Sequence, residues 1–346
     1  MSNPSNFRIA HIMAGAVNGG AELFFERLCI AQHLQKLSVL PIIRKNSDRK
    51  RKFTEVGLFS HELRFGGLLD LSTKYELKRI LKDFSPRVAV AWMNRAASFM
   101  PRGDWINVGR LGGFYDLKYY RQCDHLVGNT KGIVEWIKNQ GWPENRVHHV
   151  PNFARTFPDA CARRPYYIPN NAPFLLALGR LHVNKGFDIL IKAMPNLANT
   201  HLLIAGEGEE RQKLENLARF LKVQDRVHMP GWIGDISGII QACDILVCSS
   251  RHEPLGNIVL EGFSATKPVV ALAAQGPVEL IDNGKNGLLT PLEDETALSK
   301  AIASLTNDAA LSQRIAIAGR QKFEREFSQA TVLQKWYEFL TRIEKI

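Results

Sequence analysis

Residues 249–262 read SSRHEPLGNIVLEG. The apolar run Ile245–Cys248 directly before them predicts a buried strand, and a helix is expected to begin near Asn257. Glu253 then lies in the connecting loop, and Glu261 lies about one turn into the helix. A strand, a loop and a helix in this order form the repeating unit of a parallel α/β sheet, so this stretch indicates the fold class.

The loop and helix start of this stretch carry groups that suit a phosphorylated sugar. Backbone N–H groups around Gly256–Ile258 would point toward an anion, because the first turn of a helix leaves them unpaired. A carboxylate can accept two hydrogen bonds from a vicinal diol such as that of a ribose. Glu261 therefore suits a ribose, and Glu253 suits a sugar ring near the phosphates. The alternative is that both acids are solvated surface residues.

A loop with two cations follows the apolar run Phe174–Leu178. Residues 179–186 read GRLHVNKG, which places Arg180 and Lys185 five positions apart on one strand-to-helix loop. The two cations could hold a diphosphate, because arginine offers a forked contact and lysine a point charge. The alternative interpretation is a pair of solvated surface charges.

Two glycine-rich turns also follow predicted strands. Gly206-Glu207-Gly208 lacks the third glycine and the later acidic residue of an NAD site, so we interpret it as a turn that shapes the nucleotide side of the site. Residues 15–22 read GAVNGGAE and lie between a strand and a helix. They could bring backbone N–H groups close to a phosphate, or they could form only a tight turn.

Strands alternate with helices along the whole chain, which indicates parallel sheets with ligands beyond the carboxyl ends of the strands. Residues 150–173 interrupt this pattern with four prolines before Pro173 and read as a linker. We therefore predict an α/β protein of two Rossmann-like domains, residues 1–160 and 170–328, facing each other across a cleft. The predicted strands are 7–14, 39–43, 88–92, 105–108, 125–128, 174–178, 202–205, 227–229, 245–248 and 269–273, and the predicted helices are 21–35, 74–84, 130–139, 187–194, 209–221, 236–242, 257–265 and 313–346.

The positive charge is concentrated in the N-terminal half. Residues 1–150 hold 23 Lys or Arg against 13 Asp or Glu, whereas residues 151–346 hold 22 against 21. A positive surface attracts phosphates of nucleic acid, anionic lipid or an acidic saccharide. A solvated loop is the alternative interpretation of the densest cluster, which consists of Arg44, Lys45, Arg49, Lys50, Arg51 and Lys52.

Several protein classes are excluded by composition. No apolar run approaches the roughly 20 residues that span a bilayer, and residues 1–10 lack the pattern of a secretory signal. The chain has five cysteines, an odd number, and they form no CxxC pair. This pattern fits reduced thiols in a cytosol better than disulfides or a zinc site. They are Cys29, Cys123, Cys161, Cys243 and Cys248.

Taken together, these motifs resemble the retaining glycosyltransferases with two Rossmann-like domains (GT-B), in the large family called group 1 or family 4. The C-terminal half matches closely, and the N-terminal half matches mainly at its first loop. The residues that carry the resemblance are Gly19-Gly20-Ala21-Glu22, Gly179-Arg180-Leu181 with Lys185-Gly186, Gly206-Glu207-Gly208, Pro230-Gly231-Trp232, and Glu253 with Glu261.

This resemblance implies roles for single residues. Arg180 and Lys185 would bind the donor diphosphate, Glu261 the ribose and Glu253 the transferred sugar, so that Glu253, Arg180 and Lys185 are the predicted catalytic residues. The resemblance also implies that the reaction needs no metal. It implies that the N-terminal domain binds the acceptor and the C-terminal domain binds the donor. The last helix, about 329–346, would cross back to the N-terminal domain. The other implied donor-binding residues are Gly19, Gly20, Gly179, Gly206, Gly231, Trp232, Leu255, Gly256 and Asn257.

One segment departs from the family pattern. Many relatives carry a histidine in a loop of the N-terminal domain, but residues 109–116 read GRLGGFYD here. Arg110 or Asp116 are the candidates to take its place. His125 lies downstream, and we expect it to be packed in a strand.

The expected function is transfer of a hexose, with retention, from a UDP- or GDP-linked sugar to a glycan or lipid-linked acceptor in lipopolysaccharide core or surface polysaccharide synthesis. The expected location is the cytoplasm, with the basic cluster Arg44–Lys52 on an anionic membrane surface. A nucleotide-sugar epimerase is the alternative enzyme, and a non-catalytic relative stays open. A nucleic-acid-binding protein is disfavoured, because aromatic residues are not interleaved with the basic cluster.

Overall fold

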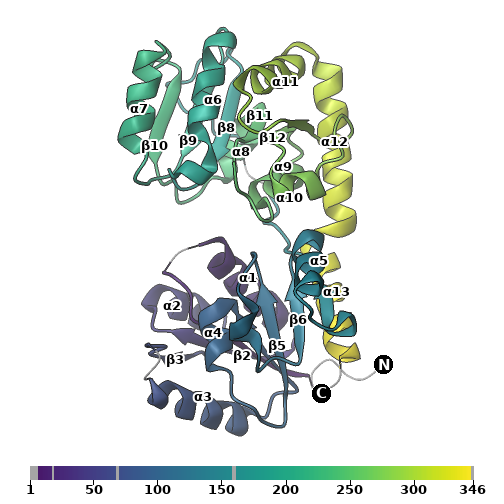
Figure 1. The fold of residues 1–346 in the computed structure, drawn as a ribbon. Coiled ribbons are helices and arrows are strands. Elements are labelled where there is room, and N and C mark those ends of the chain that lie inside the picture. The colour runs from purple at the N-terminus through teal and green to yellow at the C-terminus, as the bar shows by residue number, and fades with distance from the viewer. Residues whose placement is uncertain (1–6, 18, 68–69, 158–160, 344–346) are drawn as a thin grey trace. The chain divides into compact units, whose positions relative to one another are not determined.

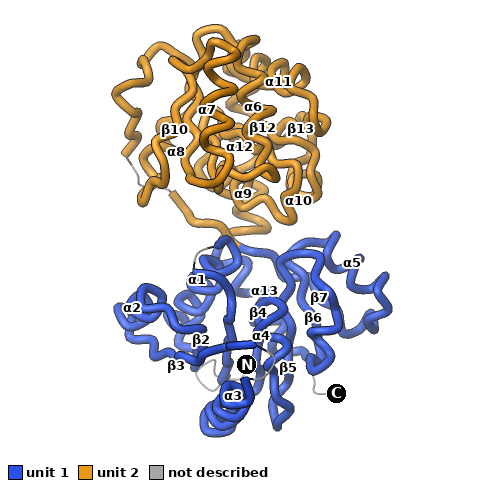
Figure 2. The backbone as a smooth tube through the Cα atoms, turned by 60° about the vertical axis from the view of Figure 1, so that its left-hand side comes forward, with its two compact units in different colours: residues 1–152, 329–346 blue, residues 153–328 orange. Residues whose placement is uncertain are grey.

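The computed structural model describes residues 7–17, 19–67, 70–157 and 161–343. The chain divides into two compact units, residues 1–152 with 329–346 and residues 153–328 (Figure 2). Each unit is a parallel sheet with helices on both faces (Figure 1), so the predicted α/β fold of two Rossmann-like domains is confirmed. No helix in the described ranges is long and apolar enough to cross a membrane.

Unit 1 contains a seven-stranded sheet in the order β3-β2-β1-β4-β5-β6-β7. Helices α3, α4 and α5 pack on one face of it, and α1 and α13 contact each other and the opposite face. The elements are β1 (Arg8–Met13), α1 (Gly20–Leu34), β2 (Ser38–Arg44), α2 (Ser47–Glu55), β3 (His61–Leu63), α3 (Leu71–Phe84), β4 (Val88–Trp92), α4 (Met93–Phe99), β5 (Ile106–Leu111), η2 (Leu117–Tyr120), β6 (His125–Gly128), α5 (Lys131–Asn139), η3 (Glu144–Arg146), β7 (Val147–His149) and α13 (Gln329–Arg342).

Unit 2 contains a six-stranded sheet in the order β10-β9-β8-β11-β12-β13. Helices α6, α7 and α11 share one core, and α8 and α9 share the other. The elements are β8 (Phe174–Leu178), η4 (Val183–Lys185), α6 (Phe187–Ala193), η5 (Met194–Asn196), β9 (His201–Ala205), α7 (Arg211–Phe220), β10 (Val227–Gly231), α8 (Ser237–Ala242), β11 (Ile245–Cys248), α9 (Asn257–Ser264), β12 (Val269–Leu272), α10 (Gln275–Leu280), β13 (Leu288–Thr290), α11 (Glu295–Asn307) and α12 (Ala309–Glu326).

The boundary between the units differs from the predicted linker. Residues 153–157 belong to unit 2, because Ala154 and Phe157 are buried in its core. The predicted helix 313–346 is two helices, of which α12 lies in unit 2 and α13 in unit 1. The return of the chain to unit 1 is fixed by Trp336, which is fully buried and packs edge-to-face on His11.

Four of the six cations of the basic cluster lie on helix α2, whereas Arg44 ends β2 and Lys45 follows it, so the interpretation of the cluster as a loop is wrong. Asn46 caps α2 by accepting the N–H of Arg49 at 2.9 Å. Arg49 is 2% exposed, and its guanidinium donates to the carboxylate of Glu26 at 2.8 Å. A buried and paired Arg49 cannot reach a lipid head group, so only the other cations of the cluster remain available at the surface.

Unit 1 should lose stability on mild acidification because of His11. Its ring is fully buried: Trp92 Nε1 donates to Nδ1 at 3.2 Å, and Nε2 lies 2.8 Å from Gln32 Oε1. Burial lowers the pKa of His11 to about 4. The hydrogen bond to Gln32 partly opposes this shift, and the positive charge of Arg110 adds to it. As the pH falls, His11 is therefore protonated in the unfolded chain before it is protonated in the folded chain. About 3 kcal/mol of stability should be lost as the pH falls from 6.5 to 4.

Urea unfolding followed by tryptophan fluorescence at pH 7 and pH 4 measures this loss. The control is His11→Gln, whose amide can keep both hydrogen bonds without titrating. The variant should lose about 3 kcal/mol less than the wild type over the same pH range. Equal losses in the two proteins would contradict the assignment to His11.

Candidate active site

The predicted donor loops of unit 2 lie at one edge of its sheet. All strand pairs are parallel, so the loops that follow the strands share the carboxyl edge. The strand order reverses between β8 and β11, and ligands of open α/β sheets bind at such a switch point. The loop 179–186 follows β8 and the loop 249–256 follows β11. The two loops singled out by their charges are therefore neighbours.

An ion pair joins these two loops. Lys185 Nζ donates to Glu253 Oε2 at 2.5 Å, and both side chains are largely buried. Ser250 Oγ donates to the same carboxylate oxygen at 3.2 Å. Burial alone would lower the pKa of Lys185, but the charge of Glu253 outweighs it and raises that pKa above its ordinary value. Lys185 is therefore a fixed cation at the switch point.

Arg251, which the sequence reasoning missed, holds the two loops together. Its guanidinium donates to both carboxylate oxygens of Asp188, at 2.6 and 2.8 Å, and to both of Glu293, at 2.5 and 2.9 Å. These bonds raise the pKa of Arg251, so its charge is permanent. Its backbone N–H also donates to Asn184 O at 2.8 Å. This clamp fixes the position of Lys185 relative to Glu253.

Glycines allow the loops to pack backbone against backbone. A Cβ on Gly206 would collide with Gly179 O, and a Cβ on Gly186 would collide with Ser249 O. The backbone φ of Gly186 is +59°, a value that residues with a side chain rarely adopt. Gly206 therefore serves close packing of the β8 and β9 loops, as expected of a tight turn at residues 206–208.

Helix α9 begins where the sequence predicts and is tied to Glu253. Gly256 precedes it with φ +90°, and its N–H donates to Glu253 Oε1 at 3.3 Å. Leu255 is buried, Asn257 is the first helical residue, and Glu261 lies partly buried in the second turn. Glu253 thus connects Lys185 to the start of α9.

Other predicted donor residues lie around this centre. Arg180 is exposed, and its charge acts on Lys185. Gly231 ends β10 with φ +93°, and Trp232 follows with 66% of its surface exposed. An indole so exposed is available to contact a flat ring such as a nucleotide base.

The first loop of unit 1 is folded around Glu22. Ala16 N–H donates to Glu22 Oε1 at 2.7 Å, and a Cβ on Gly15 or Gly19 would collide with this carboxylate. Glu22 is 3% exposed, so its carboxylate serves to hold the loop. Gly20 is the first residue of α1.

The two candidates for the missing histidine differ in burial. Arg110 is 2% exposed and stacks on Trp92, with the guanidinium carbon 4.4 Å from the ring centroid. Burial lowers its pKa to about 9. Asp116 is half exposed and pairs with Lys118 at 2.7 Å. His125 is packed in β6, as predicted, with its Nδ1 at 3.1 Å from His148 Nε2.

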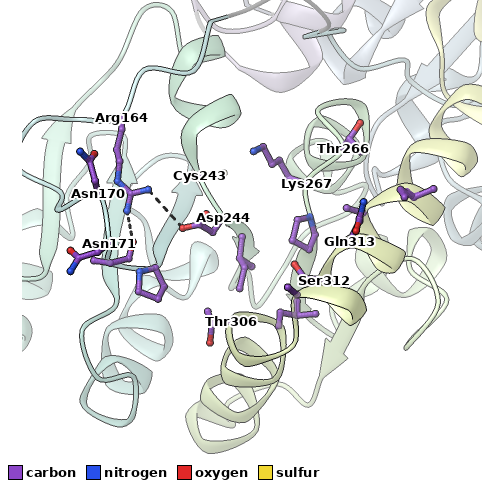
Figure 3. Close-up of a pocket in the computed structure, with 18 residues that line it drawn as sticks. Arg164, Asn170, Asn171, Cys243, Asp244, Thr266, Lys267, Thr306, Ser312 and Gln313 are labelled. Carbon is purple, nitrogen blue, oxygen red and sulfur yellow. Dashed lines mark hydrogen bonds and ion pairs between the residues drawn. The ribbon is translucent and has the colours of Figure 1, made fainter.

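A cavity of about 610 Å³ lies at the opposite edge of the unit 2 sheet (Figure 3). Pro173, Asp244 and Pro268, which line it, precede β8, β11 and β12 and mark the amino ends of these strands. Its cations are engaged: Arg164 lies 3.8 Å from Asp244, and Lys267 donates to a backbone carbonyl at 2.7 Å. The cavity is therefore separate from the site at the carboxyl edge.

Comparisons with known proteins agree on one family. The profile of the family described as glycosyl transferases group 1 matches residues 161–322. The chain is 32% identical to the lipopolysaccharide core biosynthesis glycosyltransferase LpsD of Rhizobium meliloti, over 97% of this chain and 98% of that protein. For LpsE of the same organism the identity is 33%, over 96% and 98%. The crystal structure of Anabaena HepE with UDP and glucose matches with TM-score 0.82 at 19% identity, over 98% of this chain and 100% of that one.

The close approach of Gly206 to Gly179 predicts the effect of one methyl group. Gly206→Ala should destabilise unit 2 by about 1–3 kcal/mol, because backbone must move to admit the Cβ. Gly234→Ala is the matched control, since nothing lies within 4 Å of its Cβ position, and it should change stability by less than about 0.5 kcal/mol. Thermal unfolding of both variants measures the difference, and equal midpoints would contradict the packing argument.

Proposed function

The chain belongs to the group 1 glycosyl transferases, and from this premise we propose that it moves a hexose, with retention, from a UDP- or GDP-linked sugar to a lipid-linked glycan. The matched family and both curated relatives are transferases, so the alternative of a nucleotide-sugar epimerase is set aside. Retention, the donor base and the acceptor are the parts that this proposal adds to the family assignment.

The observation that carries the proposal is the Lys185–Glu253 pair at the β8/β11 switch point, beside the start of α9. Lys185 and the exposed Arg180 supply two positive charges for a diphosphate. Glu253 supplies acceptor oxygens for the hydroxyls of the transferred sugar, and Glu261 does so for the ribose. HepE, which shares the fold, was crystallised with UDP and glucose, and this supports a nucleotide-sugar donor.

Charge development explains how these residues would accelerate the transfer. As the bond from the anomeric carbon to the diphosphate breaks, negative charge grows on the leaving phosphate. Lys185, Arg180 and the N–H groups at the start of α9 would stabilise this charge where it forms. We propose a same-face displacement without a metal, in which the leaving phosphate helps to take the proton of the acceptor hydroxyl. The carboxylate of Glu253 would orient the sugar during this step.

The acceptor is proposed from the curated relatives. LpsD and LpsE are named for lipopolysaccharide core biosynthesis, and the chain aligns over nearly their full length. We therefore propose an acceptor in a lipopolysaccharide core or similar surface glycan, modified in the cytoplasm. All five cysteines are free thiols, which fits a reducing compartment. The exposed cations of α2 would rest on anionic lipid that carries the acceptor.

Nucleotide binding can be measured without knowledge of the acceptor. A ligand that binds only the folded state at about 100 times its Kd stabilises it by about 2.7 kcal/mol. Thermal shifts with UDP, GDP and ADP should therefore show one nucleotide that raises the midpoint of unit 2 by roughly 5 °C or more. Midpoints that stay unchanged with all three nucleotides would contradict the proposed donor site.

Removal of single donor residues should abolish transfer while the fold persists. Lys185→Ala and Glu261→Ala should each lower the transfer rate at least about 100-fold, by loss of one charge-assisted contact to the donor. Lys213→Ala on α7 is the control, because Lys213 is exposed and forms an ion pair with Glu210, which lies just before the same helix. Rates are measured by release of the nucleoside diphosphate in the presence of acceptor. Full activity of either site variant would refute the assignment of that residue.

A further inference from the structure

The cavity of about 610 Å³ at the amino edge of the unit 2 sheet takes no part in the proposed donor site (Figure 3). β8 spans five residues, which at about 3.3 Å per residue places the loop before it roughly 15 Å from the loop after it. We call this hollow the amino-edge cavity. Its volume lies within the range of cavities that bind small molecules, so its walls indicate which ligand it suits.

Uncharged polar side chains line two sides of the amino-edge cavity. Asn170 and Asn171 lie on one side, and Ser312 and Gln313 of α12 lie on the other (Figure 3). None of these four side chains forms a hydrogen bond with another residue in the described ranges. Each amide and each hydroxyl can both donate and accept hydrogen bonds, as a sugar hydroxyl can. The walls therefore suit a ligand that carries several hydroxyl groups.

The charged groups of the amino-edge cavity are already engaged within unit 2. Arg164 donates to the carbonyl oxygens of Pro169, at 2.9 Å, and of Ala172. Its guanidinium also lies 3.8 Å from the carboxylate of Asp244, and Lys267 donates to a backbone carbonyl at 2.7 Å. A phosphate in the cavity would lie beside the like charge of Asp244 and would compete with these contacts. The cavity therefore favours an uncharged ligand.

The loop that forms one wall of the cavity also carries two tyrosines. Tyr166 and Tyr167 belong to the loop 164–172, whose end residues are joined by a hydrogen bond. Tyr166 is 98% exposed, and its ring lies edge-on to that of Tyr167 with 5.2 Å between the centroids. Tyr167 packs in turn on His228, which stacks on His201. An aromatic ring as exposed as Tyr166 can stack on the apolar face of a sugar ring.

The histidines behind the tyrosines carry no charge at neutral pH. Burial lowers the pKa of His228 and of His201 below the ordinary value of a histidine. The positive charges of Arg226 and Arg164 lower the pKa of His201 further. The aromatic cluster and the amides of the cavity thus point to the same uncharged class of ligand.

We propose that the amino-edge cavity and its tyrosine-bearing loop form a non-catalytic binding site for an uncharged oligosaccharide. One sugar would lie in the cavity and exchange hydrogen bonds with Asn170, Asn171 and Gln313, and a neighbouring sugar would stack on Tyr166. The binding itself does not rest on the proposed function. Only its consequence does, namely that a glycan held on unit 2 has a raised local concentration at the transferase.

The test uses maltotriose, cellotriose and mannotriose, which are uncharged and differ in the arrangement of their hydroxyl groups. Saturation-transfer NMR with the full chain should show that at least one of them binds at millimolar concentration. The binding should not change with salt, because no ion pair forms. Saturating UDP should not displace the trisaccharide, because the amino-edge cavity lies at the opposite edge of the sheet from the donor loops.

Two variants assign the binding to this site. Asn170→Ala/Asn171→Ala/Gln313→Ala should lower the affinity at least about tenfold by removing three hydrogen-bonding side chains. Tyr166→Ala should lower it about two- to tenfold by removing the stacked ring. All four side chains are exposed, so the thermal midpoints of both variants should stay close to that of the wild type.

The matched control is Gln140→Ala/Gln212→Ala/Gln334→Ala, which removes three exposed amides away from the cavity and should bind as the wild type does. Equal affinity of the Asn170→Ala/Asn171→Ala/Gln313→Ala variant and the wild type would overturn the proposal. So would displacement of the trisaccharide by UDP, or the absence of binding by all three probes.

AMP is the contrasting probe, because it joins a flat ring to a phosphate. If AMP binds the wild type and the triple amide variant loses that binding, the cavity holds a nucleotide and the proposal is overturned. The outcome is separate from that for the donor site. A chain that binds UDP but no trisaccharide contradicts the amino-edge site alone, whereas a chain that binds a trisaccharide but no UDP, GDP or ADP supports it and contradicts the proposed donor site.

Discussion

Every strand pair in both sheets is parallel, and this constraint determines where ligands can bind. Parallel strands bring all the loops that follow them to one edge of the sheet, and reversal of the strand order leaves two of these loops side by side. In unit 2 the reversal brings Lys185 to Glu253, and in unit 1 it brings the loop after Gly15 to Met93. The chemistry of each unit follows from which side chains the sequence places in those loops.

The electrostatics of the unit 2 site depend on a network rather than on a single pair. Lys185 and Glu253 are both partly buried, and a partly buried ion pair contributes favourably only if its geometry is held. Arg251 provides that constraint through Asp188 and Glu293. The cation and the carboxylate are thus held in place without a ligand. In the proposed transfer, little reorganisation would then be needed when charge moves onto the leaving phosphate.

The sequence predicted the parts of the molecule that depend on local pattern. Apolar runs predicted the buried strands, and glycines with charged neighbours predicted the loops at the β8/β11 switch point. The clamp of Arg251 and the buried Arg49 could not be predicted, because both depend on acids more than 20 residues away. The helix α2 was missed because its residues are mostly charged, and its cap at Asn46 is a short-range signal that the charge cluster obscured. The donor-binding and catalytic roles of all the predicted site residues, Lys185, Glu253 and Glu261 among them, stay predictions.

The net charge of the chain is distributed unevenly between the two units. Unit 2 holds 19 Lys or Arg and 19 Asp or Glu, so its net formal charge is zero. All of the net charge of +11 lies on unit 1, where Arg44, Arg64 and Arg95 form no ion pair with any described residue. A field of one sign attracts anionic molecules from a distance and makes their capture sensitive to salt.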